Sequence, residues 1–320
     1  MMEIGVDVKP THDLNVDIRD AFFDEVYRIA ASDRNVIVLT DDQGAFSLER
    51  FKNDLQGQYF NMGIAEQNII SVAAGLALGG KIPFVYGIST FMTMRCFEQI
   101  RDDLSCMNLP VTIVGSGPGY SYGSDGPTHH ATQDVAILRT LPHLTILNPA
   151  DAVASTACVQ MGYKAVGPTY IRIERGVLPV LYDDHHSFSA GFAQIRMGRD
   201  LLIISTGIMV HKALEVSDRL SEIGIGAGVL DLYRLKPVYE PSLLSSLQGV
   251  ERIVTLEENS IVGGLGSLVA EILADHKRMI ALKRIALPDR HCYEYGNRDW
   301  QHSYEGLDVA GIVRVIEGWK

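Results

Sequence analysis

Short apolar runs alternate with amphipathic stretches along most of the chain. Runs that predict buried strands cover 36–40, 82–86, 111–115, 144–147 and 170–173 in the first half, and 201–205, 228–232, 252–256 and 280–285 in the second. Between most of them lie residues at helical spacing, as in 17–31, 65–79 and 309–317. This alternation is typical of α/β proteins. It predicts an α/β fold with mostly parallel sheets.

The alternation stops once, over residues 176–192, where Gly, Pro and Ser gather in the sequence GVLPVLYDDHHSFSAGF. We place a domain boundary there, which gives a first domain over 1–185 and a second, smaller α/β domain over 186–320. A chain of 320 residues fits this division, since domains average roughly 150 residues.

Charge and composition exclude several classes of protein. The 28 basic and 39 acidic residues give a net charge of −11, which disfavours generic binding to nucleic acid or to anionic membranes. The apolar run 69–78 is too short to span a bilayer, and 1–13 lacks the basic start and apolar core of a signal peptide. The 4 cysteines form no CxxC pair, so neither zinc nor disulfides are indicated, and we expect a cytoplasmic protein.

Glu66 is the first candidate for chemistry. It begins the predicted helix 65–79, whose following two turns are apolar. A first-turn acid is favoured by the positive end of the helix dipole, and this is the simpler interpretation. The other is a largely buried carboxylate that needs a partner, and such groups concentrate at functional sites. The pattern alone leaves both open.

Three apolar side chains, Phe91, Met94 and Phe97, follow the run 82–86 at helical spacing. On a helix they would share one face. Such a stripe usually packs into a core. It also suits the wall of a pocket for a flat heteroaromatic ring.

Residues 115–130 (GSGPGYSYGSDGPTHH) form a long segment rich in Gly, Ser and Pro after a predicted strand. Ligands of α/β proteins bind to loops at strand ends. Asp125, His129 and His130 place a carboxylate and two imidazoles within six positions. The spacing offers too few acid and His ligands for a metal ion, so we expect no metal site here.

Charged groups also end two later strands. Arg172, Glu174 and Arg175 close the run 170–173, and strand-end arginines are either surface charges or bidentate ligands for phosphate. Residues 257–259 (EEN) precede 263–266 (GGLG), whose glycines begin a helix. A helix N-terminus can hold an anion, but a tight strand-to-helix turn is the interpretation we favour there.

Seven segments taken together resemble the transketolase family of thiamine diphosphate enzymes. They are GIAEQN (63–68), STF (89–91), EQIRDD (98–103), DGPTHH (125–130), NPAD (148–151), IRIERG (171–176) and EENSIVGGLGS (257–267). They occur in the family's order over roughly residues 17–315. Nothing resembles the GDG motif of the family's diphosphate-binding domain. The resemblance implies a pyrimidine-binding domain over 1–185, a transketolase C-terminal domain over 186–320, and the C-terminal subunit of a split transketolase.

The resemblance assigns residues to thiamine diphosphate, which the family binds with Mg²⁺. Glu66 matches the glutamate that hydrogen-bonds N1′ of the aminopyrimidine, and Phe91 matches an aromatic residue that stacks on that ring. Met94 and Phe97 complete the wall, although many transketolases have an aromatic residue where Met94 stands. Asp42 lies near a family acid beside the cofactor.

The resemblance also implies a substrate site. Asp125 matches an acid that contacts a sugar hydroxyl, and His129 matches a catalytic histidine near the reacting centre. Arg175, Arg19 and Ser47 fall where transketolases bind a sugar phosphate. The implied reaction transfers a two-carbon ketol unit from a ketose, which we expect to be phosphorylated, to an aldose.

A chain of this kind needs a separate N-terminal subunit that holds the diphosphate and most of the metal ligands. We expect a self-dimer that recruits two such subunits, α2β2. Three alternatives stay open: the β subunit of a 2-oxo acid dehydrogenase, a 1-deoxyxylulose-phosphate synthase-like enzyme that takes pyruvate, and a noncatalytic regulatory subunit. The DGPTHH segment and Arg175 argue against the first, because an oxo acid needs neither.

Overall fold

The structure is a computed structural model that describes residues 16–183 and 185–319. Its strands are β1 Val36–Thr40, β2 Tyr59–Asn61, β3 Ile82–Ile88, β4 Thr112–Ser116, β5 Thr145–Leu147, β6 Thr169–Ile173, β7 Ala193–Arg196, β8 Leu201–Ser205, β9 Ala227–Asp231, β10 Arg234–Lys236, β11 Arg252–Ser260 and β12 Ala281–Leu287.

The α-helices are α1 Ile18–Ala30, α2 Leu48–Asp54, α3 Glu66–Leu78, α4 Phe97–Gln99, α5 Asp134–Leu138, α6 Ala152–Tyr163, α7 Met209–Glu222, α8 Glu240–Ser246, α9 Leu265–Asp275, α10 Arg298–Glu305 and α11 Val309–Glu317. Two short 3₁₀ turns, η1 Gln56–Gln58 and η4 Gly123–Asp125, and two π-helical segments, η2 Phe91–Arg95 and η3 Ile100–Ser105, complete the described elements.

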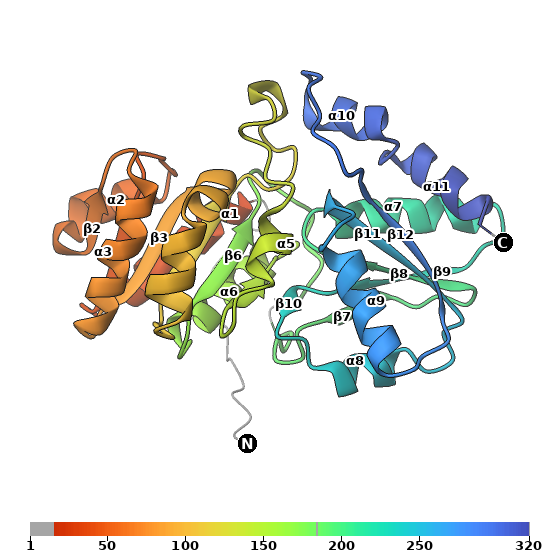
Figure 1. Cartoon of the computed structure of the whole chain (residues 1–320), viewed down its shortest axis with the longest axis horizontal. Coiled ribbons are helices and arrows are strands. Elements are labelled where there is room, and N and C mark those ends of the chain that lie inside the picture. Colours follow the sequence, from red (N-terminus) through yellow and green to blue (C-terminus); the bar gives the residue numbers. More distant parts are fainter. Residues whose placement is uncertain (1–15, 184, 320) are drawn as a thin grey trace.

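Two sheets lie side by side, each between layers of helices (Figure 1). The first has the strand order β10-β5-β6-β4-β3-β1-β2 and the second the order β12-β11-β8-β9-β7. Neighbouring strands are parallel, except that β10 runs antiparallel to β5 and β7 antiparallel to β9. The α/β fold with mostly parallel sheets, predicted from the sequence, is confirmed.

The apolar runs of the sequence correspond to the central strands of the sheets. β1, β4 and β6 are buried at every position, as expected of parallel strands covered on both faces. Helices α1 and α6 cover one face of the first sheet, and α3 with the π-helical segments covers the other. The Asp17 carboxylate caps α1 by accepting the backbone N–H of Arg19 at 2.8 Å.

The two units, one built on each sheet, share one apolar core. A single cluster of buried side chains extends from Ile69 and Ile113 in the first unit to Ile204 on β8 and Leu265 on α9 in the second. Strand β10 also crosses between the units, because it follows β9 in the chain but pairs with β5 of the first sheet. The domain boundary at residue 185 stays a prediction.

The described part of the chain contains no helix that is long and apolar enough to cross a membrane.

Candidate active site

The carboxyl ends of β1, β3, β4 and β6 meet at one edge of the first sheet, since these strands are parallel neighbours. Ligands of α/β proteins bind at this edge. The segments that follow these strands carry most of the residues singled out from the sequence. The longest of them, between β4 and α5, rises beside α10 of the second unit (Figure 1).

The sequence left two interpretations of Glu66 open, a first-turn acid on the surface of a helix and a buried carboxylate. The structure shows the buried carboxylate. It is the first residue of α3, and its side chain is almost fully covered. Its Oε1 accepts a hydrogen bond from Arg95 Nη1 at 2.6 Å. A buried carboxylate paired with one cation has the character of a site residue rather than of a surface helix cap.

Asp41, which sequence reasoning missed, is the second buried acid. Its carboxylate lies over Gly87 of β3, where any Cβ would collide with it. Burial raises the pKa of Asp41 to about 6; the backbone N–H of Gln43 opposes this rise, and the Glu66 carboxylate adds to it. Asp41 and Glu66 therefore act on each other electrostatically.

Asp42, the acid assigned to the cofactor from the resemblance, is exposed. Its backbone is left-handed, with φ of 75°, and its Oδ1 accepts a hydrogen bond from Asn61 Nδ2 at 2.8 Å. The structure thus places Asp41, and not Asp42, beside Glu66.

The helical face expected for Phe91, Met94 and Phe97 is not regular. Two π-helical segments, η2 and η3, flank the three residues of α4, so the spacing departs from that of an α-helix. All three side chains are half-buried. Phe97 lines a cavity of about 520 Å³ together with Arg101 and Cys106. The structure does not show Phe97 in contact with Phe91.

Phe91 does meet a residue from the β4–α5 loop. The His129 ring lies edge-on to it, with 5.1 Å between ring centroids. Thr128 Oγ1 lies 3.1 Å from His129 Nδ1. Asp125, in η4, is exposed. The fold therefore brings His129 to the aromatic wall, and it leaves Asp125 at the surface.

His130 has a different environment from His129. It is buried and packs edge-on against Tyr120, with 4.7 Å between ring centroids. Burial lowers the pKa of His130, while a backbone hydrogen bond to Gly123 and the charge of Glu258 oppose this. The two histidines thus have separate surroundings, since His130 is buried against Tyr120 and His129 lies against Phe91.

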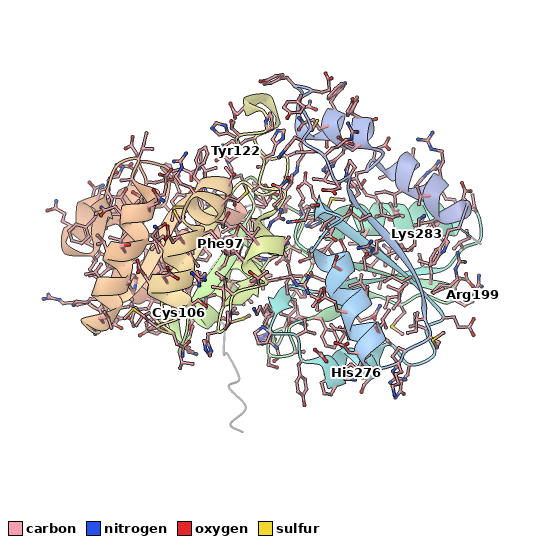
Figure 2. The ribbon with its side chains drawn as sticks, viewed as in Figure 1. Phe97, Cys106, Tyr122, Arg199, His276 and Lys283 are labelled. Atoms are coloured by element: carbon pink, nitrogen blue, oxygen red, sulfur yellow. The ribbon has the colours of Figure 1, made fainter. Side chains whose placement is uncertain are left out.

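Tyr122 and Gln43 join the site although the sequence did not single them out. Gln43 Nε2 donates a hydrogen bond to Tyr122 Oη at 2.6 Å, and the Arg175 guanidinium lies 5.0 Å from the centre of the Tyr122 ring. Tyr122 and His129 are 6.2 Å apart between centroids. Tyr122 lies on the loop that rises between the two units (Figure 2). In the sequence, the position of Tyr122 in the Gly-rich segment 115–130 was the only sign that it lies at this edge.

Arg19 and Ser47 lie close to the end of β6. Gly176 N donates to Asp17 Oδ2 at 2.8 Å, which brings the start of α1 next to Arg175. Ser47 Oγ donates to the carbonyl oxygen of Asp20 at 3.3 Å. These contacts place the start of α1, which carries Arg19, near the segments of Arg175 and Ser47. An anion site formed by the three side chains stays a prediction.

Two buried tyrosine hydroxyls lie among the polar side chains at this edge. The Tyr86 hydroxyl interacts with Arg19 and Ser116, and the Tyr170 hydroxyl interacts with Ser89. No group of three His, Cys, Asp or Glu side chains in 16–183 and 185–319 has the arrangement of a metal site.

Charged side chains of both units hold the β4–α5 loop. Arg298, at the start of α10, pairs with Glu174 at 2.7 Å and also with Glu258. These carboxylates accept hydrogen bonds from the loop, from Ser121 Oγ to Glu174 and from Tyr120 N to Glu258, each at 3.2 Å. We call Glu174, Arg298 and Glu258 the loop clamp.

The predicted strand-to-helix turn at 263–266 is confirmed as a turn without a free anion site. Glu257 Oε2 and Oε1 accept the backbone N–H groups of Leu265 and Gly266, each at 2.7 Å. The Glu257 carboxylate thus occupies the N-terminus of α9.

Arg172, the first of the strand-end arginines, has a structural partner. It is buried in an ion pair with Asp134 at 2.8 Å.

Comparison with known proteins agrees with this geometry. Residues 15–180 match the model of the transketolase pyrimidine-binding domain, and 192–312 match that of the transketolase C-terminal domain. The chain belongs to the transketolase family. Family membership, predicted from seven short segments, is therefore confirmed.

Two relatives are themselves subunits. The chain is 36% identical over 300 residues to a subunit of the apulose-4-phosphate transketolase of Phocaeicola vulgatus, covering 93% of this chain and 95% of that protein. It is 35% identical over 301 residues to the 6-deoxy-6-sulfo-D-fructose transketolase subunit SqwH of a Clostridium species, covering 93% and 92%.

A solved structure described as a split gene transketolase, inactive β4 tetramer, superimposes with a TM-score of 0.84. It is 32% identical, and the match covers 95% of this chain and 97% of that one. The assignment of this transketolase chain as a subunit of the split type, made from the sequence, is confirmed by these relatives.

Proposed function

We propose that the chain supplies the aminopyrimidine half of a thiamine diphosphate site in a split transketolase. The observation that carries the proposal is the buried Glu66 carboxylate, which lies with the Phe91 ring at the ligand-binding edge of a parallel sheet. A hydrogen-bonding carboxylate and an aromatic face are the two groups that a flat, nitrogen-containing ring needs.

When bound, thiamine diphosphate supplies an electron sink for the transferred two-carbon unit. The residues of this chain do the rest. Glu66 would hold a hydrogen bond at ring nitrogen N1′, Phe91 would provide an aromatic face for the ring, and Met94 and Phe97 are assigned to the outer wall. We assign to His129 the role of holding or moving a proton at the substrate oxygen; the contact of its ring with Phe91 supports this.

We propose a sugar with an anionic end group as the substrate. Arg175 and Arg19 offer guanidinium groups, which bind phosphate or sulfonate oxygens in pairs, and Ser47 and Asp125 offer hydroxyl and carboxylate oxygens. The two subunit relatives support this, since their names specify a sugar phosphate and a sulfo sugar.

The diphosphate and Mg²⁺ are assigned to a partner subunit. Magnesium prefers several oxygen ligands, and a diphosphate beside a chain of net charge −11 needs neutralisation. We propose α2β2 assembly in the cytoplasm with an N-terminal transketolase subunit. That a solved relative is described as an inactive β4 tetramer supports the need for such a partner.

The test is reconstitution of this chain with its N-terminal subunit. The mixture should transfer a two-carbon ketol unit from a ketose phosphate to an aldose phosphate, with both products identified by mass spectrometry. Product formed from pyruvate instead would favour the deoxyxylulose-phosphate synthase alternative. Acyl-CoA formed with a lipoyl partner would favour the 2-oxo acid dehydrogenase, and no turnover with any donor would favour a regulatory subunit.

Arg175→Ala tests the anion site. The variant should raise KM for a phosphorylated ketose by about tenfold to a hundredfold, since a bidentate charged contact is lost, and leave KM for the unphosphorylated sugar nearly unchanged. Arg199→Ala is the control, because Arg199 is exposed on the second unit (Figure 2). Equal effects of Arg175→Ala on both sugars would show that Arg175 does not bind the phosphate.

A further inference from the structure

Arg95 contacts both of the groups that would recognise the aminopyrimidine. Its Nη1 donates to Glu66 Oε1 at 2.6 Å, and the centre of its guanidinium lies 4.2 Å from the centroid of the Phe91 ring. These contacts join an ion pair to a cation–π interaction. One side chain thus covers the carboxylate and the aromatic face together.

Exposure shows which partner can move. The Glu66 side chain is 3% exposed, whereas the Arg95 side chain is 42% exposed. Arg95 is the last residue of the π-helical segment η2. Among the described residues, its side-chain hydrogen bonds go to Glu66 alone. A long, half-exposed side chain held by one hydrogen-bonding partner and the face of one ring can swing outward, but the buried carboxylate beneath it cannot.

Charge explains why a cation lies there. Glu66 and Asp41 are two buried carboxylates whose charges act on each other. A buried negative charge needs a counter-charge or a hydrogen bond, and Arg95 supplies both to Glu66. A ligand ring that hydrogen-bonds Glu66 would take over the same task.

We propose that Arg95 is a gate: it occupies the aminopyrimidine position in the free chain and must swing out before the ring of the cofactor can bind. The inference rests on the proposed function, because it takes that position to be an aminopyrimidine site. Only chains in which Arg95 has swung out can bind the ring. The apparent affinity for the ring is therefore the intrinsic affinity multiplied by the fraction of such chains.

The experiment uses the isolated full chain and a neutral probe, 4-amino-5-hydroxymethyl-2-methylpyrimidine, which lacks the thiazolium and the diphosphate. Its dissociation constant is measured by NMR titration for wild type, Arg95→Gln, Arg95→Lys and Arg101→Gln. Arg101 is a matched control, because it is exposed on the following π-helical segment and pairs with its neighbour Asp102. Circular dichroism verifies that each variant is folded.

We expect Arg95→Gln to bind the probe about tenfold more tightly than wild type, as removal of a competing side chain predicts. Arg95→Lys should fall between them, and Arg101→Gln should match wild type. Adding Glu66→Gln to Arg95→Gln should remove the gain, since the carboxylate partner is then lost.

Two results would overturn the gate. If all variants bind the probe equally, or Arg95→Gln binds it more weakly, Arg95 does not compete with the ring, and the proposed function stands. If no variant binds the probe and the chain reconstituted with its partner binds no thiamine diphosphate, the pyrimidine site itself is wrong, and the proposed function fails with the gate.

Discussion

Two buried carboxylates at the edge of the first sheet have different surroundings. Glu66 has Arg95 as a direct partner at 2.6 Å, while Asp41 has the backbone N–H of Gln43 at 3.1 Å. The charge of Glu66 makes ionisation of Asp41 more costly. Asp41 is therefore sensitive both to pH and to any ligand that changes the charge of Glu66.

Glu66→Gln should keep the fold and lower kcat of the reconstituted enzyme. An amide cannot provide the acid–base assistance of a carboxylate, which is worth about 10²–10⁴ in rate. The measurement is kcat at saturating cofactor, with the exposed Glu98→Gln as control. A kcat near that of wild type would remove Glu66 from the chemistry.

Asp41→Asn should change how stability depends on pH. The pKa of Asp41 is raised from 3.8 to about 6, so the folded chain holds this proton more tightly than the unfolded chain does. The resulting stabilisation is complete below pH 3.8 and is lost as pH rises through about 6. Wild type should therefore lose about 2–3 kcal/mol relative to the variant over that range.

Urea unfolding of both proteins between pH values near 4 and 7 measures this difference. Asp42→Asn is the matched control, because Asp42 is the exposed neighbour of Asp41. A difference between Asp41→Asn and wild type that stays constant with pH would contradict the assigned burial of this carboxyl group.

Sequence reasoning singled out Glu66, Phe91, His129 and Arg175, because they stand in segments that resemble a family, and their roles stay predictions. It named Asp42 and not Asp41, since nothing in an Asp-Asp pair shows which one is buried. In the folded turn Asp41 is buried, whereas Asp42 is exposed with a left-handed backbone. Arg95 was missed for a similar reason: its partner Glu66 comes from a distant position in the chain.

At the scale of elements, the β4–α5 loop depends on the second unit. Gly119, with φ of 57°, lies where any Cβ would collide with the Glu258 carboxylate. Burial opposes the charge on Glu258, yet Arg298 and then His302 outweigh it and lower the pKa of this acid. The loop that carries His129 is therefore fixed by an ionised group of the other unit.

Arg298→Lys should loosen that loop. Lysine keeps the charge but lacks the planar fork that reaches both Glu174 and Glu258. Hydrogen exchange of the backbone amides in 117–125 should become about tenfold faster, as expected if local opening costs less. Arg290→Lys is the control, since the exposed Arg290 pairs with Glu305 instead. Unchanged protection of the loop would show that the clamp does not hold it.

The elements that the sequence predicted are the buried ones. Strands β1 and β8 match the predicted runs residue for residue, because central parallel strands are apolar along their length. Strands β2, β7 and β10 were missed, since edge strands of three or four residues carry no such signal. The π-helical segments were also missed, because the sequence does not show where an extra residue enters a helical turn.

At the scale of the molecule, the two units form one body around the site. They share an apolar cluster, and strand β10, which follows β9 of the second sheet, pairs with β5 of the first sheet. They also meet in the loop clamp. The contacts of the loop clamp join residues more than a hundred positions apart, which explains why local patterns did not reveal them. The resulting edge holds groups suited to a pyrimidine ring and to an anionic sugar.

On the proposed function, this chain holds only half of a cofactor site. The most direct measurement is calorimetric titration of thiamine diphosphate with Mg²⁺ into the isolated chain and into its mixture with the N-terminal subunit. We predict no micromolar binding and no ketol transfer by the chain alone, and both with the partner. Micromolar binding with turnover by the isolated chain would contradict the division of the site between two subunits.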